Sequence, residues 1–273
     1  MKSASIIAYI KRKLKKKTMY MKKFAWILSA VVGLLLTSCL ENEGYSYTGT
    51  FCRVVTIDHE SNPPRFICDY TGEVYVCDNI NQDSDLGPFD LKNAKRALAY
   101  FSYQADLNES IISLSQGCAP IEVTDLWCQS LPKDKTYNPV FGFTRMQVES
   151  GWEYPYAWVS QGYLNIVPIA YSDEAVVPYL APAGVGGDTL KFNLYLSHER
   201  GNNYRSQYMC FDLRQLKDTA NAEPKFRPWM KDMTDLIKQK DSVVVCVWAD
   251  YQASDTLKKV TIPTSHFSFS LND

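Results

Sequence analysis

Residues 156–166 read Tyr156-Ala157-Trp158-Val159-Ser160-Gln161-Gly162-Tyr163-Leu164-Asn165-Ile166, a pair of short strands joined by a turn at Gly162. Aromatic and β-branched residues favour strands, and a glycine between two such runs favours a tight turn. The pattern recurs through the chain after residue 50, where short apolar runs alternate with turn residues at intervals of about 8–12, as in sandwiches and barrels. The sequence therefore predicts an all-β fold.

Two blocks of strands lie on either side of Gln129–Pro139, which reads as a linker because it has two prolines and mixed charge. Trp229–Lys240 is the one segment with helical spacing of apolar residues. We therefore expect a first β domain over residues 46–130 and an antiparallel β-sandwich with one short helix over residues 140–273. The expected strands are 52–57, 65–69, 73–77, 95–105, 111–114 and 120–127, then 144–149, 163–171, 189–197, 207–213, 242–251 and 259–263.

The front of the chain carries the pattern of a bacterial lipoprotein signal. Lys22-Lys23 precede the apolar run Phe24–Leu36, and small residues then lead to a cysteine in Leu36-Thr37-Ser38-Cys39. The run is shorter than the roughly 20 residues of a membrane span and fits the hydrophobic region of a secretory signal. We therefore expect residues 1–39 to be a signal segment, with Met21 as the true start, cleavage before Cys39 and lipid on its thiol. A transmembrane anchor is the alternative to the signal, and a long basic n-region over the first 20 residues is the alternative to a start at Met21.

Cleavage changes the charge of the chain. The whole sequence has 29 Lys and Arg and 30 Asp and Glu. Residues 1–39 hold nine of the basic residues and none of the acidic ones, so the mature chain has 20 basic and 30 acidic residues and a formal charge of −10. Nucleic-acid binding depends on Lys and Arg that neutralise phosphates. We therefore expect no nucleic acid as a partner.

Seven cysteines remain after Cys39, an odd number that leaves at least one unpaired in an exported protein. Several lie in apolar strand-like runs, where cysteine acts as a small buried hydrophobe. Cys68 and Cys77 lie on the two arms of an expected hairpin with its turn at Thr71-Gly72, but the sequence does not give the register that would pair them. No C-x-x-C is present, so zinc-ribbon spacing is absent.

An alternating aromatic row, Trp152, Tyr154, Tyr156 and Trp158, is the strongest candidate ligand site. In one continuous strand these side chains would share a face, because side chains alternate across a sheet. Trp152, Tyr154 and Tyr156 are the residues that we expect to stack on a ligand such as a sugar ring. The alternative is a core strand, and Pro155 favours an edge strand or a bend.

A weak calcium-loop pattern is the only metal candidate. Its oxygen ligands would be Asn79, Asn81, Asp83 and Asp85. The sixth loop position, which should be glycine, is Ser84, and the twelfth, which should be glutamate, is Asp90. A solvated acidic loop therefore fits better, and we expect no metal.

No motif identifies a catalytic centre. The three histidines, His59, His198 and His266, are not in an H-E-x-x-H motif, and no G-x-S-x-G is present. A Ser-His-Asp triad stays open, because its members need not be close in sequence. Gly184–Gly187 is followed by a strand-like run instead of the helix start that a phosphate site needs, so it predicts a hairpin loop. We expect a protein without enzymatic activity and without a cofactor.

The chain resembles the NigD-like lipoproteins of Bacteroides-type bacteria. The resemblance lies in the lipobox, a short β domain, a linker, and the Trp158, Gly162 and Tyr163–Ile166 pattern. It implies a small OB-like barrel at the N-terminus and a β-sandwich at the C-terminus, with no catalytic residues. The acidic run Leu40–Glu43 resembles the tags of surface-exported lipoproteins in such bacteria, which implies the outer membrane and exposure at the cell surface.

Three functions follow as hypotheses. The first is a non-catalytic envelope lipoprotein, held to the membrane by its N-terminal lipid, that binds a protein or a glycan. The second is an immunity-type protein against a bacteriocin, which rests on the naming of the family. The third is a lipid-anchored hydrolase.

Overall fold

The computed structural model describes residues 47–80, 86–105, 110–149, 152–240, 243–253 and 256–263. The described residues from 48 to 104 and from 110 to 263 belong to one compact unit. The signal segment and Cys39 lie outside the described residues, as do Asn81, Asp83, Asp85 and His266.

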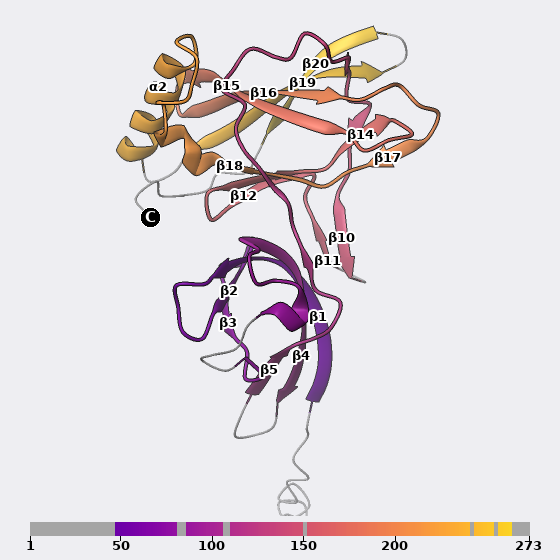
Figure 1. Cartoon of the computed structure of the whole chain (residues 1–273), viewed down its shortest axis with the longest axis vertical. Helices are drawn as coiled ribbons and strands as arrows, with labels where there is room; N and C mark the ends of the chain where they lie inside the picture. Colours follow the sequence, from indigo (N-terminus) through magenta and orange to yellow (C-terminus); the bar gives the residue numbers. More distant parts are fainter. Residues whose placement is uncertain are drawn as a thin grey trace, which may run out of the picture. The chain divides into compact units, whose positions relative to one another are not determined.

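The N-terminal strands form a curled antiparallel sheet in the order β3-β2-β1-β4-β5 (Figure 1). The strands are β1 (Tyr47–Asp58), β2 (Arg65–Cys68), β3 (Val74–Val76), β4 (Arg96–Ala105) and β5 (Ser110–Leu114), with β6 (Ala119–Pro120) beside β4. The backbone N–H of Asp78, just after β3, donates to Ile112 of β5 at 2.8 Å, which links the two ends of the sheet. A five-stranded, partly open barrel is the OB-like arrangement, so the predicted fold of this block is confirmed.

The described part of the segment between β3 and β4 adds to the core of the barrel. It contains a 3₁₀ turn, η1 (Gly87–Phe89), and buries Ile80, Leu86 and Leu91 in the same cluster as Phe66 and Phe101. The sequence predicts a solvated acidic loop over residues 79–90, and that prediction was wrong for Ile80 and Leu86, which are buried. Their apolar surface is removed from water by the curled sheet, which a short barrel needs in order to complete its core.

The C-terminal block contains two main sheets. The first has the order β12-β13-β18-β7, and the second β15-β16-β19-β20 with β8 beside β16. The first consists of β12 (Ala157–Ser160), β13 (Tyr163–Ile166), β18 (Met209–Asp212) and β7 (Val123–Thr124), and the second of β15 (Val177–Gly186), β16 (Thr189–Ser197), β19 (Val244–Ala253), β20 (Thr256–Pro263) and β8 (Tyr137–Asn138). The predicted all-β class is therefore confirmed.

The sandwich is not purely antiparallel, which corrects the prediction. β7 runs parallel to β18, and β16 runs parallel to β19. Parallel neighbours need a long crossover connection, often a helix. Between β16 and β19 that connection includes α2 (Arg227–Gln239), the predicted helix.

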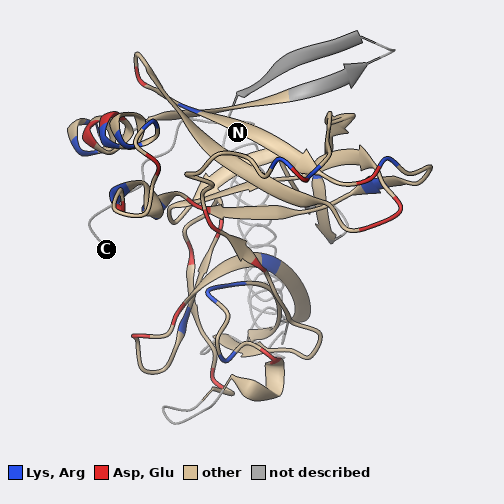
Figure 2. Cartoon of the chain, turned by 45° about the horizontal axis from the view of Figure 1, so that its top comes forward, with Lys and Arg blue, Asp and Glu red and all other residues tan. Residues whose placement is uncertain are grey.

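One hydrophobic core joins the two main sheets and the helix. Leu164 and Phe211 from the first sheet cluster with Phe192 from the second and with Met230 and Met233 from α2. The outer face of α2 carries acidic and basic residues side by side (Figure 2). An amphipathic helix of this kind is held by the packing of its apolar face. Among the described residues, no helix has the length and apolar content of a bilayer span.

Two small sheets complete this block. A hairpin pairs β10 (Met146–Glu149) with β11 (Trp152–Tyr154), and a three-stranded sheet has the order β17-β14-β9, formed by Tyr204–Ser206, Pro168–Tyr171 and Gly142–Phe143.

The sequence did not predict β15, because the strand contains Pro178, Pro182 and Gly184. At the edge of a sheet a proline need not donate to a neighbour, and the register shifts between Pro182 and Gly184. The predicted glycine loop is correspondingly shorter: the strand runs to Gly186, and only Gly187 (φ +60°) and Asp188 form the turn to β16.

No disulfide joins the seven cysteines of the described ranges. In the β2–β3 hairpin Arg65 lies opposite Val76 and Ile67 opposite Val74, so Cys68 and Cys77 do not face each other. Both thiols are buried in the barrel, and burial raises the pKa of each to about 12. They are therefore core residues.

Candidate functional site

A buried ion pair lies where barrel strands meet sandwich strands. Arg96, the first residue of β4, donates from both terminal nitrogens to the two carboxylate oxygens of Asp69, each at 2.6 Å. Both side chains are 0 % exposed. The backbone N–H of Asp69 donates to Val54 of β1 at 2.9 Å, which fixes the carboxylate just beyond the end of β2. Two parallel hydrogen bonds to a carboxylate are the strongest geometry available to arginine.

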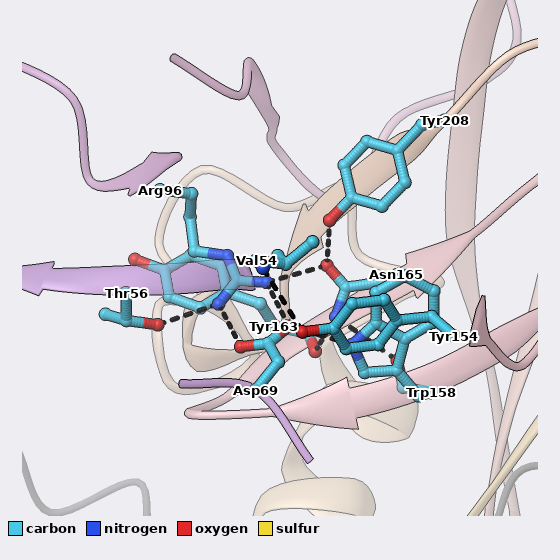
Figure 3. A network of polar contacts seen from close by, with 9 residues as sticks. All are labelled: Val54, Thr56, Asp69, Arg96, Tyr154, Trp158, Tyr163, Asn165 and Tyr208. Atoms are coloured by element: carbon cyan, nitrogen blue, oxygen red, sulfur yellow. Dashed lines mark hydrogen bonds and ion pairs between the residues drawn. The ribbon is translucent and has the colours of Figure 1, made fainter. Parts of the chain in front are cut away.

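Side chains from the sandwich complete the pair (Figure 3). The Trp158 indole N–H donates to Asp69 Oδ2 at 2.8 Å. Asn165 Oδ1 accepts from Arg96 Nη2 at 2.9 Å and from the Tyr208 hydroxyl at 2.5 Å. We call Asp69, Arg96, Tyr154, Trp158, Asn165 and Tyr208 the clamp, because its polar contacts join the barrel strands to the sandwich strands.

The β12–β13 hairpin explains how Trp158 and Asn165 reach the same place. They are direct cross-strand partners. The two-residue turn uses Gln161 (φ +51°) and Gly162 (φ +76°), the positive angles typical of a type I′ turn. A Cβ on Gly162 would lie 2.8 Å from Arg214 Cγ, so both the angle and the close approach favour glycine.

Aromatic rings seal one side of the clamp. Tyr154, at the end of β11, stacks on Trp158 with 4.7 Å between ring centroids, and Tyr208 lies 5.8 Å from Trp158. The Tyr154 hydroxyl accepts the backbone N–H of Val54 at 3.2 Å, which adds a contact from β11 to β1. Tyr154 and Trp158 share a buried cluster with Val54. Water therefore has no path to the ion pair from this side.

Tyr163 of β13 lies between two guanidinium groups. The Arg96 Cζ is 4.9 Å from the centroid of its ring and the Arg214 Cζ is 4.2 Å from it. Arg214 is held in turn by Asp212, with its Nε 2.8 Å from Oδ1. Cations over a ring face are stabilised by the ring quadrupole, more strongly where water is excluded.

The surroundings of the clamp raise the pKa values of its arginine and of its two tyrosines. Burial alone would lower the pKa of Arg96, but the Asp69 carboxylate holds that pKa well above its ordinary value. Burial also raises the pKa of Tyr154 and of Tyr208. These directions keep Arg96 charged and both tyrosines neutral at ordinary pH, which fits a structural role for the clamp.

The predicted aromatic row is divided between two environments. β11 ends at Tyr154 and β12 begins at Ala157, so Pro155 and Tyr156 form a bend and the row is not one continuous face. Tyr154 is 0 % exposed and belongs to the clamp, where no ligand ring can reach it, whereas Tyr156 is 36 % exposed. The side chain of Trp152 lies outside the described residues.

Asn79 is the one calcium-loop candidate within the described residues. Its Nδ2 donates to the carbonyl of Leu114 at 2.8 Å, and its Oδ1 accepts the N–H of the same residue at 2.9 Å. Both ends of the amide are therefore used to pair with β5. No group of three or more His, Cys, Asp or Glu in the described part of the chain is placed to hold a metal ion.

The two histidines in the described ranges form hydrogen bonds with different parts of the chain. His59 Nε2 lies 2.8 Å from the carbonyl of Ala94, and His198 Nδ1 lies 2.9 Å from the carbonyl of Glu199. Neither contacts a serine or a carboxylate in the hydrogen bonds that the structure gives them. A hollow of about 520 Å³ is lined by Asp90, residues 92–95, residues 120–123 and Asp125, with no histidine, cysteine or serine among its lining residues.

An exposed aromatic group was missed by the sequence reasoning. Phe141, Tyr171 and Tyr204 have ring centroids 4.9–6.1 Å apart, and each pair meets edge to face at 74–85°. Phe141 is 37 % and Tyr204 58 % exposed. We call these three residues the aromatic surface. They come from three separate segments beside or within β9, β14 and β17, so no local pattern in the sequence could reveal them.

No family model matches the sequence, and a comparison with curated proteins finds no match. Solved structures do match. A "Putative lipoprotein" from Bacteroides fragilis is 14 % identical, covers 79 % of this chain and 97 % of its own, and has a TM-score of 0.51. A toxin-related protein from Parabacteroides distasonis (16 % identity, 79 % and 93 % coverage, TM-score 0.46) and a NigD-like immunity protein from Bacteroides caccae (12 %, 78 % and 91 %, 0.43) also match. The first likeness supports the resemblance at the level of fold.

Proposed function

We propose that this chain is a NigD-like lipoprotein of the cell envelope, anchored by lipid on Cys39, that binds a protein or a glycan without catalysing a reaction. The observation that carries the non-catalytic part is the clamp. Active sites place charged groups with shifted pKa values in a cleft that substrate can enter. Here Arg96, with its raised pKa, and its partner Asp69 are 0 % exposed and bonded to each other.

The anchored location rests on the sequence. The apolar run before Leu36-Thr37-Ser38-Cys39 fits a lipoprotein signal. The fold likeness to a protein named as a lipoprotein agrees with this assignment. The acidic residues after Cys39 favour the outer membrane and the cell surface as the location.

Metabolic labelling with an alkyne fatty acid tests the anchor. We expect the wild-type chain to incorporate the label and to fractionate with outer membranes, and Cys39→Ala to lose both properties. Cys118→Ala, which removes a half-buried cysteine of the mature chain, is the matched control and should keep the label. Label retained in Cys39→Ala would contradict the lipidation site. Complete protection from protease on intact cells would contradict surface exposure.

Two parallel experiments test whether the chain binds a glycan or a protein. The lipid-free mature protein is titrated with an array of oligosaccharides and, in parallel, cells that carry the wild-type chain are treated with a crosslinker. Reproducible binding in either experiment supports a binding role. Cleavage of an oligosaccharide on the array would instead support the hydrolase.

A further inference from the structure

β17 is an open edge within the described part of the three-stranded sheet, where it pairs only with β14 (Figure 1). Ser172 donates its N–H to Asn203 at 2.9 Å, and Gln207 donates to Pro168 at 3.2 Å. Hydrogen-bonding residues alternate along an antiparallel pair. Arg205, opposite Ala170 in the register, therefore points its backbone groups to β14.

By the same alternation, Tyr204 and Ser206 turn their backbone N–H and C=O groups away from β14, toward the free edge. All three residues of β17 are exposed. A row of such groups is a template for another strand, and proteins use it to bind extended peptides.

The aromatic surface lies beside this edge. Tyr171 and Tyr204 are cross-strand neighbours with ring centroids 5.9 Å apart, and Phe141 lies 4.9 Å from Tyr171. A strand added next to β17 would place the side chains of one of its faces against these rings. Aromatic residues of this kind are the ones that most often dominate binding energy in protein interfaces.

Charged side chains on and near β17 indicate which residues a partner strand should carry. Arg205 projects to the face opposite Tyr204, because neighbouring side chains in a strand alternate. Nearby, the Asp173 carboxylate already accepts from Asn203 Nδ2 at 2.5 Å, while Arg200, Glu174 and Glu199 are exposed on the rim.

A second copy of this chain pairing through β17 about a two-fold axis at Arg205 would set two arginines opposite each other. Like charges directly opposite in a sheet are destabilising. A carboxylate on a different chain would instead be stabilised there. A glycan offers no row of N–H and C=O groups at strand spacing, so a protein segment is the better occupant.

We propose that β17 and the aromatic surface receive an extended segment of another protein, which adds as a strand, places apolar side chains on the aromatic surface and a carboxylate opposite Arg205. This inference rests on the proposed binding function and names its partner class. The segment should alternate apolar and acidic residues, because its two faces meet different surfaces.

The test uses fluorescein-labelled heptapeptides and the lipid-free mature protein, with binding read by fluorescence anisotropy. A peptide that alternates Val and Glu should bind about fivefold more tightly than one that alternates Val and Lys, and Arg205→Glu should reverse this preference. Ser206→Pro removes an outward N–H without taking a bond from β14 and should weaken binding about tenfold. Tyr204→Ala should weaken it by a similar factor.

Tyr70→Ala is the matched control, because Tyr70 is an exposed tyrosine of the barrel (70 % exposed). It should leave peptide binding unchanged. A Val-Glu peptide with N-methyl groups that remove the N–H groups on its bonding edge should fail to bind. On binding of the unmodified peptide, hydrogen exchange at Tyr204 and Ser206 should slow.

Four results would overturn the proposal. They are no binding of any heptapeptide at millimolar concentration, binding insensitive to both Ser206→Pro and Tyr204→Ala, competition by an oligosaccharide at the same residues, and dimerisation of the chain that Ser206→Pro abolishes. None of these depends on lipidation, so they are distinguishable from failure of the anchor at Cys39. Binding of a glycan elsewhere would leave the proposed function standing without this surface.

Discussion

Replacing Asp69 by asparagine should be among the most damaging single changes in the clamp. The side chain keeps its shape, but Arg96 then carries a buried charge without a carboxylate at 0 % exposure. Removing one partner of a buried pair costs about 3–5 kcal/mol, because the remaining charge is uncompensated. A domain is stable by only about 5–15 kcal/mol, so this one substitution should remove a large share of the free energy of unfolding.

Urea unfolding followed by circular dichroism measures the effect. With a denaturant slope of about 2–3 kcal/mol/M, a loss of about 3–5 kcal/mol should lower the midpoint by about 1–2.5 M. Asp235→Asn is the control. It removes the carboxylate of an exposed pair with Lys231 on α2, in which the two side chains are 42 % and 72 % exposed. Exposed pairs contribute less than about 1 kcal/mol, so the midpoint should hardly move.

The double variant Asp69→Asn with Arg96→Met separates charge from packing. If the stranded charge causes the loss, replacing it by an apolar side chain of similar length should recover part of the stability. Two results would refute the reasoning. The first is a loss of less than about 1 kcal/mol in the free energy of unfolding for Asp69→Asn. The second is additivity, in which Arg96→Met lowers the free energy of unfolding as much in the Asp69→Asn background as in the wild-type chain.

Three further predictions concern single positions. Gly162→Ala should lower the free energy of unfolding by about 1–3 kcal/mol, because alanine is strained at φ +76°, and a thermal melt will detect it. The Ser61 hydroxyl is the main cause of the lowered pKa of Asp58. A carboxyl whose pKa is lower in the folded state stabilises the fold above its unfolded pKa of about 3.9, and this stabilisation is lost as the pH falls through the folded pKa. Ser61→Ala should therefore reduce the difference in the free energy of unfolding between pH 6 and pH 3. In native protein at pH 8, iodoacetamide should modify half-buried Cys118 before Cys68, whose pKa burial raises to about 12, as peptide mass spectrometry can show; equal rates would contradict the assigned burial.

Local patterns in the sequence predicted strands where side chains alternate between core and solvent. The segment 189–196 has this pattern, and β16 runs from Thr189 to Ser197 as predicted. α2 was predicted from its apolar spacing within two residues at its start. β15 was missed because prolines and glycines are tolerated where a strand has a free edge and a bulge, and a sequence does not state which strand is at the edge.

The clamp could not be predicted, because its members are distant in sequence. The resemblance pointed to Trp158 and to Tyr163–Ile166, but not to the partners of these residues. Asp69 and Arg96 lie 89 and 69 residues from Trp158 and Asn165, their respective partners. The alternation at Tyr154 was equally ambiguous: a buried ring against Trp158 and a ligand platform have the same sequence pattern, and only the bend at Pro155 and the burial of the ring distinguish them.

The central claim is that the clamp makes the barrel and the sandwich one cooperative structure, with binding left to the exposed edge. The boundaries 46–130 and 140–273 remain a prediction, and native-state hydrogen exchange read by mass spectrometry tests whether such halves open separately. We predict that the slowest amides of β1 and β4 and those of β13 and β16 share one free energy of opening to within about 1 kcal/mol, and that Asp69→Asn separates them. Barrel amides that exchange far more readily than sandwich amides in the wild-type protein would contradict the claim.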